Sequence, residues 1–176
     1  MNGDHGCLVP GAACCVRCEV PRARCVRGAC REVRSSRQEE ASGMAQREHA
    51  VIHSHKLPRP MGPYSPGITY EGLLFVSGQG ATDPTTGRLA GLDVESQTEQ
   101  ALRNIASILE AAGSRLDCVL RCGVFLVDIR DFPAMNAVYE RVFGRHRPAR
   151  TTVGVASLPA HGLRVEIDAV AYVPKP

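Results

Sequence analysis

The last part of the chain carries the pattern that most restricts the fold. From Leu163 to Val173 every second residue is apolar, and most of the residues between them are polar. The side chains of a β-strand point alternately to its two faces, so this run predicts a strand with one face against a core. The expected core face holds Leu163, Val165, Ile167, Ala169, Ala171 and Val173, and the opposite face holds Arg164, Glu166, Asp168, Val170 and Tyr172.

The preceding segments predict the layers that cover this strand. Apolar residues at three- and four-residue steps predict helices, and short apolar runs between turn residues predict strands. The helices are expected at 93–112 and 131–143, and the strands at 51–55, 68–70, 73–77, 119–127, 151–155 and 163–173. This order is typical of an α+β fold, a mixed sheet with two helices on one face. The strand at 119–127 is apolar on both faces and is expected to be covered on both.

The first 46 residues are different in composition. They lack apolar periodicity and are rich in Arg, Gly, Ser and Cys, which predicts a disordered leader before a folded domain at 47–176. Met44 is an alternative translation start, in which case the leader is not made. A zinc site begun by Cys15-x-x-Cys18 and a targeting peptide are weaker alternatives, because no second ligand pair follows and acidic residues interrupt the leader. No metal or organic cofactor is expected.

Composition narrows the classes of function. The chain has 176 residues, a net charge of +3, 5% aromatic residues and no Trp. Such a modest charge and so few stacking side chains argue against nucleic-acid binding. No apolar run reaches the length of about 18 residues that a transmembrane helix needs. A cytoplasmic protein without a membrane partner is therefore expected.

Two residues near the C-terminus form a candidate site. Arg150 opens one predicted strand and Glu166 lies inside the next, so the two side chains are expected to meet across neighbouring strands. A planar guanidinium binds a carboxylate with two parallel hydrogen bonds, and a carboxylate can take a proton from water. The face of the sheet that the helices leave uncovered holds Glu166 and is either solvent-exposed or a subunit interface with polar pockets.

Five short motifs follow one another in the chain with a familiar spacing. They are Gly62-Pro63-Tyr64-Ser65, Ser77-Gly78-Gln79, Asn136-Ala137-Val138-Tyr139-Glu140, Pro148-Ala149-Arg150 and Val165-Glu166-Ile167-Asp168-Ala169-Val170-Ala171. Taken together, over roughly Val51 to Val173, they resemble the RidA (YjgF) family. Each motif is weak alone, and the five in register make the resemblance specific.

The resemblance implies a homotrimer of chorismate-mutase-like subunits, with sites at the subunit interfaces. It also implies hydrolysis of reactive 2-imino acids, or their enamine tautomers, to 2-keto acids and ammonia. In this role Arg150 would bind the substrate carboxylate and Glu166 would activate water. The pocket would be lined by Tyr64, Ser77, Gly78, Asn136 and Thr152. Family members that are deaminases often carry Cys where this chain has Thr152. A main-chain contact at this position would survive the change, whereas a thiol contact would not.

Other functions stay open at this point. A trimer that binds a keto acid or another small metabolite without turnover is the main alternative. Nucleic-acid action through Arg145, Arg147 and Arg150 is a more distant one. The first two of these arginines also lie close to the expected site, where they could favour a more anionic substrate.

Overall fold

The structure, a computed structural model, describes residues 48–54, 56–57 and 59–175. These belong to one compact unit, Met44–Pro176. The predicted leader, the Cys15-x-x-Cys18 pair and Met44 lie outside the described residues, so the predictions made for them remain predictions. Within the described ranges no helix is long and apolar enough to cross a membrane.

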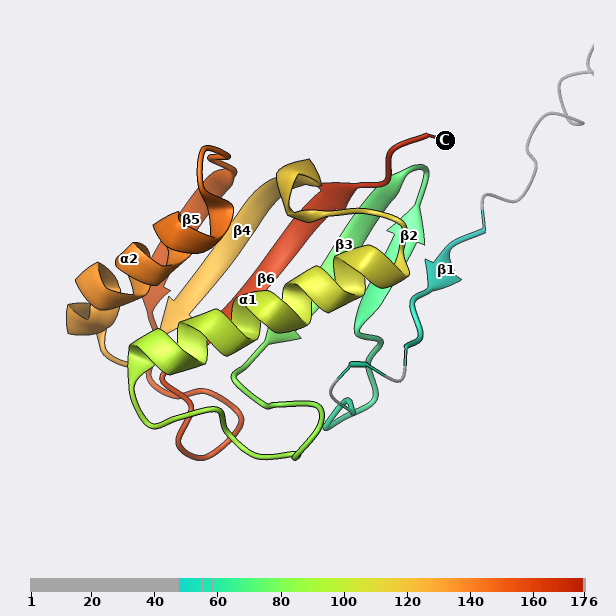
Figure 1. Cartoon of the computed structure of the whole chain (residues 1–176). Helices are drawn as coiled ribbons and strands as arrows, with labels where there is room; N and C mark the ends of the chain where they lie inside the picture. The colour runs from blue at the N-terminus through green and yellow to red at the C-terminus, as the bar shows by residue number, and fades with distance from the viewer. Residues whose placement is uncertain (1–47, 55, 58, 176) are drawn as a thin grey trace, which may run out of the picture. The chain divides into compact units, whose positions relative to one another are not determined.

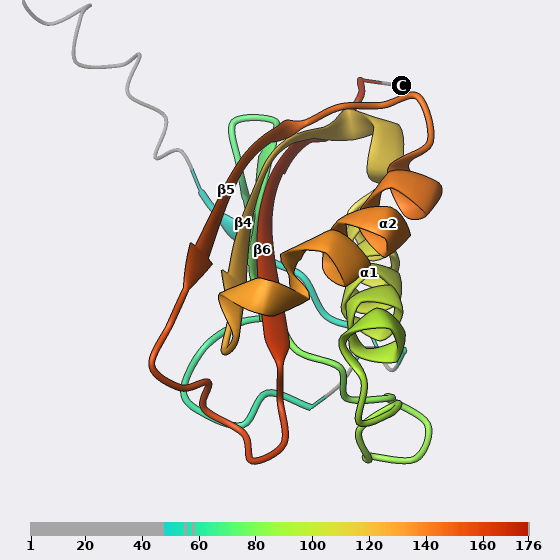
Figure 2. The same ribbon diagram turned by 90° about the vertical axis from the view of Figure 1, so that its left-hand side faces the viewer.

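A six-stranded mixed sheet carries two helices on one of its faces, as predicted (Figures 1 and 2). The helices are α1 (Val94–Ala111) and α2 (Phe132–Phe143), with short 3-10 turns at Leu116–Cys118 and Ile129–Asp131. The strands are β1 (Ala50–Val51), β2 (Gly67–Tyr70), β3 (Leu73–Gln79), β4 (Val119–Leu126), β5 (Ala149–Gly154) and β6 (Val165–Tyr172). Their order across the sheet is β1-β2-β3-β6-β4-β5.

Local chemistry explains where several elements begin and end. The turn between β2 and β3 has positive φ at both Glu71 (50°) and Gly72 (79°), the geometry of the tight hairpin turn that matches strand twist. Helix α1 begins after Asp93, whose carboxylate accepts a hydrogen bond from the Ser96 amide at 2.7 Å. The Ser96 hydroxyl also donates to the Asp93 carboxylate, at 2.9 Å, which strengthens this cap.

The alternation in β6 is confirmed by burial. Val165, Ile167, Ala169 and Ala171 are buried in the core shared with α1, whereas the residues between them lie on the open face. That open face also exposes apolar side chains, among them Phe75 (46% exposed) and Leu120 (47%). The expectation that both faces of the strand at 119–127 are covered is wrong at Leu120, because both helices lie on the same face of the sheet.

The expectation that Arg150 and Glu166 lie on neighbouring strands is also wrong. Strand β4 separates β5 from β6: Phe125 of β4 pairs with Glu166 on one side and with Val153 of β5 on the other. Strands β4 and β5 are parallel, so they need a crossover, and α2 supplies it. This βαβ connection puts β5 at the outer edge of the sheet. Strand β6 then enters between β3 and β4, antiparallel to both.

Candidate functional site

Four of the predicted site residues line one cavity. Tyr64, Ser77, Gly78 and Glu166 surround a space of about 340 Å³ at the end of the sheet where β3 finishes and β6 starts. Arg59, Met61 and Leu163 line the same cavity. Its size suits a molecule as large as a small amino acid, and its wall combines apolar groups with polar and charged side chains.

Glu166 occupies this cavity because Gly78 leaves room for it. A Cβ atom added to Gly78 would overlap the Glu166 carboxylate, with its Cδ only 2.9 Å away. Burial, and then the neighbouring charge of Asp168, raise the pKa of the Glu166 carboxyl above its ordinary value of 4.5. A half-buried carboxylate with a raised pKa is suited to accept a proton from water.

The strand bulges where Gly78 lies. The register between β3 and β6 shifts between Val76 and Gln79, as it does at a β-bulge. The side-chain amide of Gln79 donates to the carbonyl oxygens of Ser77 (3.0 Å) and Gly78 (3.2 Å) and so holds the bulge in place.

The loop before β2, which contains Pro60, Pro63 and Pro66, is anchored through Ser77. The Ser77 hydroxyl donates to the Ser65 carbonyl at 2.7 Å, and its amide donates to the Pro66 carbonyl at 3.0 Å. Its hydroxyl hydrogen is therefore engaged in fixing the loop, although Ser77 borders the cavity. Tyr64 at the tip of the loop is 47% exposed, and its hydroxyl accepts a hydrogen bond from the Met61 amide at 3.3 Å. The ring therefore lies at the surface beside the cavity that it helps to line.

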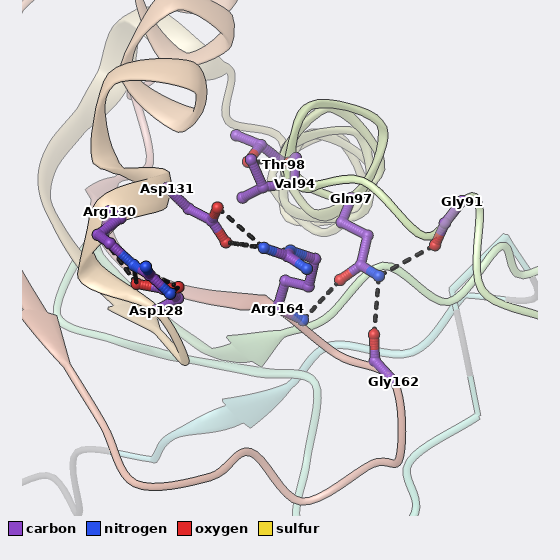
Figure 3. A network of polar contacts seen from close by, with 9 residues as sticks. All are labelled: Gly91, Val94, Gln97, Thr98, Asp128, Arg130, Asp131, Gly162 and Arg164. Atoms are coloured by element: carbon purple, nitrogen blue, oxygen red, sulfur yellow. Dashed lines mark hydrogen bonds and ion pairs between the residues drawn. The ribbon is translucent and has the colours of Figure 1, made fainter.

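Two buried amides of α1 fix the other loops around the cavity. Gln97 donates to the carbonyls of Gly91 (3.0 Å) and Gly162 (2.9 Å) and accepts from the Arg164 amide (2.8 Å), as Figure 3 shows. Two turns further along the helix, Asn104 donates to the carbonyls flanking Ala81, at Gly80 (3.0 Å) and Thr82 (2.9 Å). These contacts are buried, so each orders a loop that has no helix or strand of its own.

The remaining predicted residues gather elsewhere. Arg150 and Asn136 line a second cavity of about 310 Å³. The Arg150 guanidinium donates to the Asn136 side-chain oxygen at 2.7 Å, and its central carbon lies 4.5 Å from the centre of the Tyr139 ring. A hydrogen bond on one edge and a ring against one face orient the guanidinium before any ligand arrives. Arg147 also lines this cavity, but its guanidinium is paired with Glu140 at 3.0 Å.

Two buried hydroxyl groups nearby have no hydrogen-bond partner among the described residues. They belong to Thr152, beyond Arg150 on β5, and to Tyr139. Burial, and next the adjacent Cys122 thiol, raise the pKa of Tyr139, so its hydroxyl stays protonated. An unpaired buried hydroxyl is costly unless something completes it, and Thr152 lies at the position where the resemblance implies a ligand contact.

One subunit thus holds two half-sites on opposite faces of the sheet. Arg150 and Thr152 pair with Cys122 and Val124, whose side chains are buried in the core on the helix side. Glu166 alternates with core residues of β6 and points the other way. A single chain therefore does not bring Arg150 and Glu166 together.

Comparison with known proteins identifies the family. A family model described as Endoribonuclease L-PSP matches residues 54–173. The chain belongs to this family, also known as RidA or YjgF. A RutC family protein of Pyrococcus horikoshii is 46% identical over 122 residues, which are 69% of this chain and 96% of that protein.

Two further RidA-family relatives bear on the site. The human protein named 2-iminobutanoate/2-iminopropanoate deaminase is 40% identical over 121 residues, covering 69% of this chain and 88% of its own length. The solved structure of E. coli TdcF with bound serine is 34% identical and has a TM-score of 0.66. The match between the two covers 70% of this chain and 98% of TdcF. The α+β architecture of this RidA-family chain is thus shared with experimentally determined structures.

Sequence reasoning missed several residues that organise this RidA-family fold. Gln97 and Asn104 are spaced seven residues apart on the buried stripe that also holds Ala101 and Ile108. A buried amide side chain needs hydrogen-bond partners. Amides at core positions of a helix could therefore have been used to predict that α1 anchors a loop. The sequence places Tyr139 on the apolar stripe of α2, but no sequence pattern indicates that its ring packs against the Arg150 guanidinium. Arg59 was missed as well, since nothing in the sequence places it beside Glu166.

Proposed function

We propose that this protein hydrolyses 2-imino acids, or their enamine tautomers, to 2-keto acids and ammonia. One observation carries the proposal: each half-site contains one of the two groups that the reaction needs, in a cavity of suitable size. The name of the human relative supports the reaction, and the serine in TdcF supports a ligand of amino-acid size. The family model is named for an endoribonuclease, but cavities of about 340 and 310 Å³ suit a small metabolite better than an RNA strand.

The chemistry uses side chains alone. The Arg150 guanidinium, already oriented by Asn136 and Tyr139, binds the substrate carboxylate through two hydrogen bonds. Glu166 takes a proton from a water molecule as its oxygen attacks the imine carbon. The carbinolamine that forms loses its nitrogen as ammonia once that nitrogen is protonated, and the C=O bond of the keto acid replaces the C=N bond.

We further propose that the two half-sites meet between subunits of a homotrimer. Strand β5 lies at an edge of the sheet, and the open face beside Glu166 exposes apolar side chains including Phe75 and Leu120. An edge strand and an apolar face are surfaces that a neighbouring copy can cover. Joining the β5 side of one copy to the Glu166 cavity of the next would give a complete site.

Mixed oligomers test both statements together. We expect Arg150→Ala and Glu166→Gln each to be inactive on freshly generated 2-iminobutanoate when assayed alone. After joint unfolding and refolding of the two variants in equal amounts, about a quarter of the sites should regain both groups if neighbouring subunits share a site. Ammonia release measures the recovery, and light scattering measures the oligomeric state.

The controls separate the alternatives. Refolding each variant alone should restore no activity. Recovery that stays absent in mixed trimers would contradict a shared site. A wild-type protein that binds keto acids but releases ammonia no faster than Arg150→Ala would instead favour the metabolite-binding alternative.

The raised pKa of Glu166 predicts a pH dependence. Because Glu166 must be ionised to accept a proton, the acid limb of kcat/KM should lie above the ordinary carboxyl value of 4.5. Asp168→Asn removes the like charge and should lower the pKa of Glu166, moving the limb to lower pH. The asparagine oxygen can still accept the hydrogen bond that Asp168 takes from the Gly123 amide at 2.7 Å. An acid limb that stays in place or moves upward in this variant would exclude Glu166 as the base.

A further inference from the structure

A second positive charge borders the Glu166 cavity. Among the described side chains that line it, Arg59 and Glu166 are the charged ones, and the others are neutral. In the sequence Arg59 stands between Pro58 and Pro60, ahead of Tyr64 in the same connection before β2. Apolar groups of Pro60, Met61 and Leu163 form the wall beside it.

No side chain or backbone group among the described residues binds the Arg59 guanidinium. It has no hydrogen bond or ion pair within residues 48–54, 56–57 and 59–175. Most other arginines of these residues are engaged: Arg103, Arg115, Arg121, Arg130, Arg141, Arg147, Arg150 and Arg164 each contact an acidic or amide oxygen. A guanidinium carries five hydrogen-bond donors, so an unpaired one at the wall of a cavity can accept an anionic ligand group.

Arg59 also does not neutralise Glu166. The pKa of Glu166 is raised by burial and by Asp168, and no cation among the described residues offsets these effects. Within this part of the chain the two side chains therefore border the cavity without forming an ion pair with each other. Both line the same cavity of about 340 Å³, so a ligand held there can contact the proton acceptor and the guanidinium.

We infer that Arg59 makes this site selective for imino acids whose side chain ends in a carboxylate. This inference rests on the proposed function, in which Arg150 of the adjoining half-site holds the first carboxylate. With the imine carbon beside Glu166, the substrate side chain extends along Met61 and Pro60 toward Arg59. The substrates are then the 2-imino forms of four- and five-carbon dicarboxylic amino acids. Water adds to the C=N carbon, ammonia leaves, and the product is a 2-oxo dicarboxylate.

The proposed contact with Arg59 differs from one made by the arginines near Pro148. Arg147, which the sequence placed near the site, is committed to Glu140 and to the Gly144 carbonyl at the end of α2. Arg59 lies on the other half-site and remains available. The second carboxylate of the substrate would thus be bound by the subunit that supplies Glu166.

The test compares two substrates on one set of variants. An amino-acid oxidase of broad specificity generates imines from 2-aminobutyrate and from glutamate, and ammonia release is followed for wild type, Arg59→Met and Arg59→Lys. We expect Arg59→Met to lower kcat/KM for the glutamate imine by about 10-fold or more, mainly through KM, because one charge-assisted contact is lost. The 2-aminobutyrate imine should be hydrolysed at nearly the wild-type rate. Arg59→Lys keeps the charge and should recover part of the loss.

Arg88→Met is the matched control, since Arg88 is also exposed and lies outside the cavity. It should leave both substrates unaffected. Equal losses on both imines in Arg59→Met would show a role in loop structure and overturn the inference, while the proposed function would stand. Equal hydrolysis of the glutamate imine by wild type and Arg59→Met would overturn the inference in the same way. A wild-type protein that hydrolyses neither imine would overturn both the inference and the proposed function.

Discussion

Replacing Arg150 by alanine is expected to lower kcat/KM for 2-imino acid hydrolysis by about 10²–10⁴-fold, the loss of two charge-assisted hydrogen bonds to the substrate carboxylate. The structure makes the effect large because the guanidinium is ordered in advance. Asn136 holds one edge at 2.7 Å, and the Tyr139 ring lies under it at 4.5 Å. A substrate therefore does not have to order this side chain on binding.

Three further measurements test whether the loss comes from the carboxylate contact. Arg150→Lys keeps a positive charge but loses the planar pair of donors, so it should recover only a small part of the activity. Arg103→Ala, which removes an exposed arginine paired with Glu99, should retain full activity. Circular dichroism and light scattering should find Arg150→Ala folded and assembled as wild type. Dissociation into monomers would instead assign Arg150 a structural role.

Gly78→Ala is expected to lower kcat by about 10²-fold or more, since general base catalysis contributes this much and the added methyl displaces the base. The overlap falls on the Glu166 carboxylate rather than on the backbone. A side chain can rotate away at little cost to the fold. The thermal midpoint should consequently change little while ammonia release is nearly lost, and Glu166→Gln should reproduce the loss.

Gly123 offers a matched comparison. A Cβ atom there would lie 2.7 Å from the Asp168 carboxylate, the same relation on another strand that flanks β6. Gly123→Ala should disturb Asp168 and shift the acid limb of the pH profile, with a far smaller loss of kcat than Gly78→Ala. If the two variants lose equal activity, general crowding of the open face rather than the position of Glu166 controls the rate.

The elements of this fold were predictable, and the pairing between them was only partly so. Alternation in β6 and the apolar stripes of α1 and α2 are local patterns, and burial confirms them residue by residue. The order β3-β6-β4-β5 depends on contacts between segments far apart in the chain. No local pattern reports that β6 enters between β3 and β4, so the expected meeting of Arg150 and Glu166 failed.

The candidate site was likewise only partly predictable from the sequence. The motif residues Tyr64, Ser77, Gly78 and Glu166 were identified from the sequence, and they do line one cavity. The face on which Glu166 lies was predicted from the alternation in β6. What the sequence could not provide was that Arg150 lies on the opposite face, because that depends on how β5, β4 and β6 pair. The loop anchors Gln97 and Asn104 were equally hidden, since their hydrogen bonds reach loops that are distant in sequence.

The presence of Thr152 where family deaminases often carry cysteine has a chemical consequence. In the described part of the chain both cysteines, Cys118 and Cys122, are buried and unpaired, and burial raises the pKa of the Cys122 thiol. A thiol that stays protonated is a poor nucleophile, and oxidants and alkylating agents attack the thiolate form. Beyond Arg150 on β5 the chain therefore carries a buried hydroxyl instead of a thiol. Among the described residues there is no accessible thiol that an electrophile or peroxide could modify.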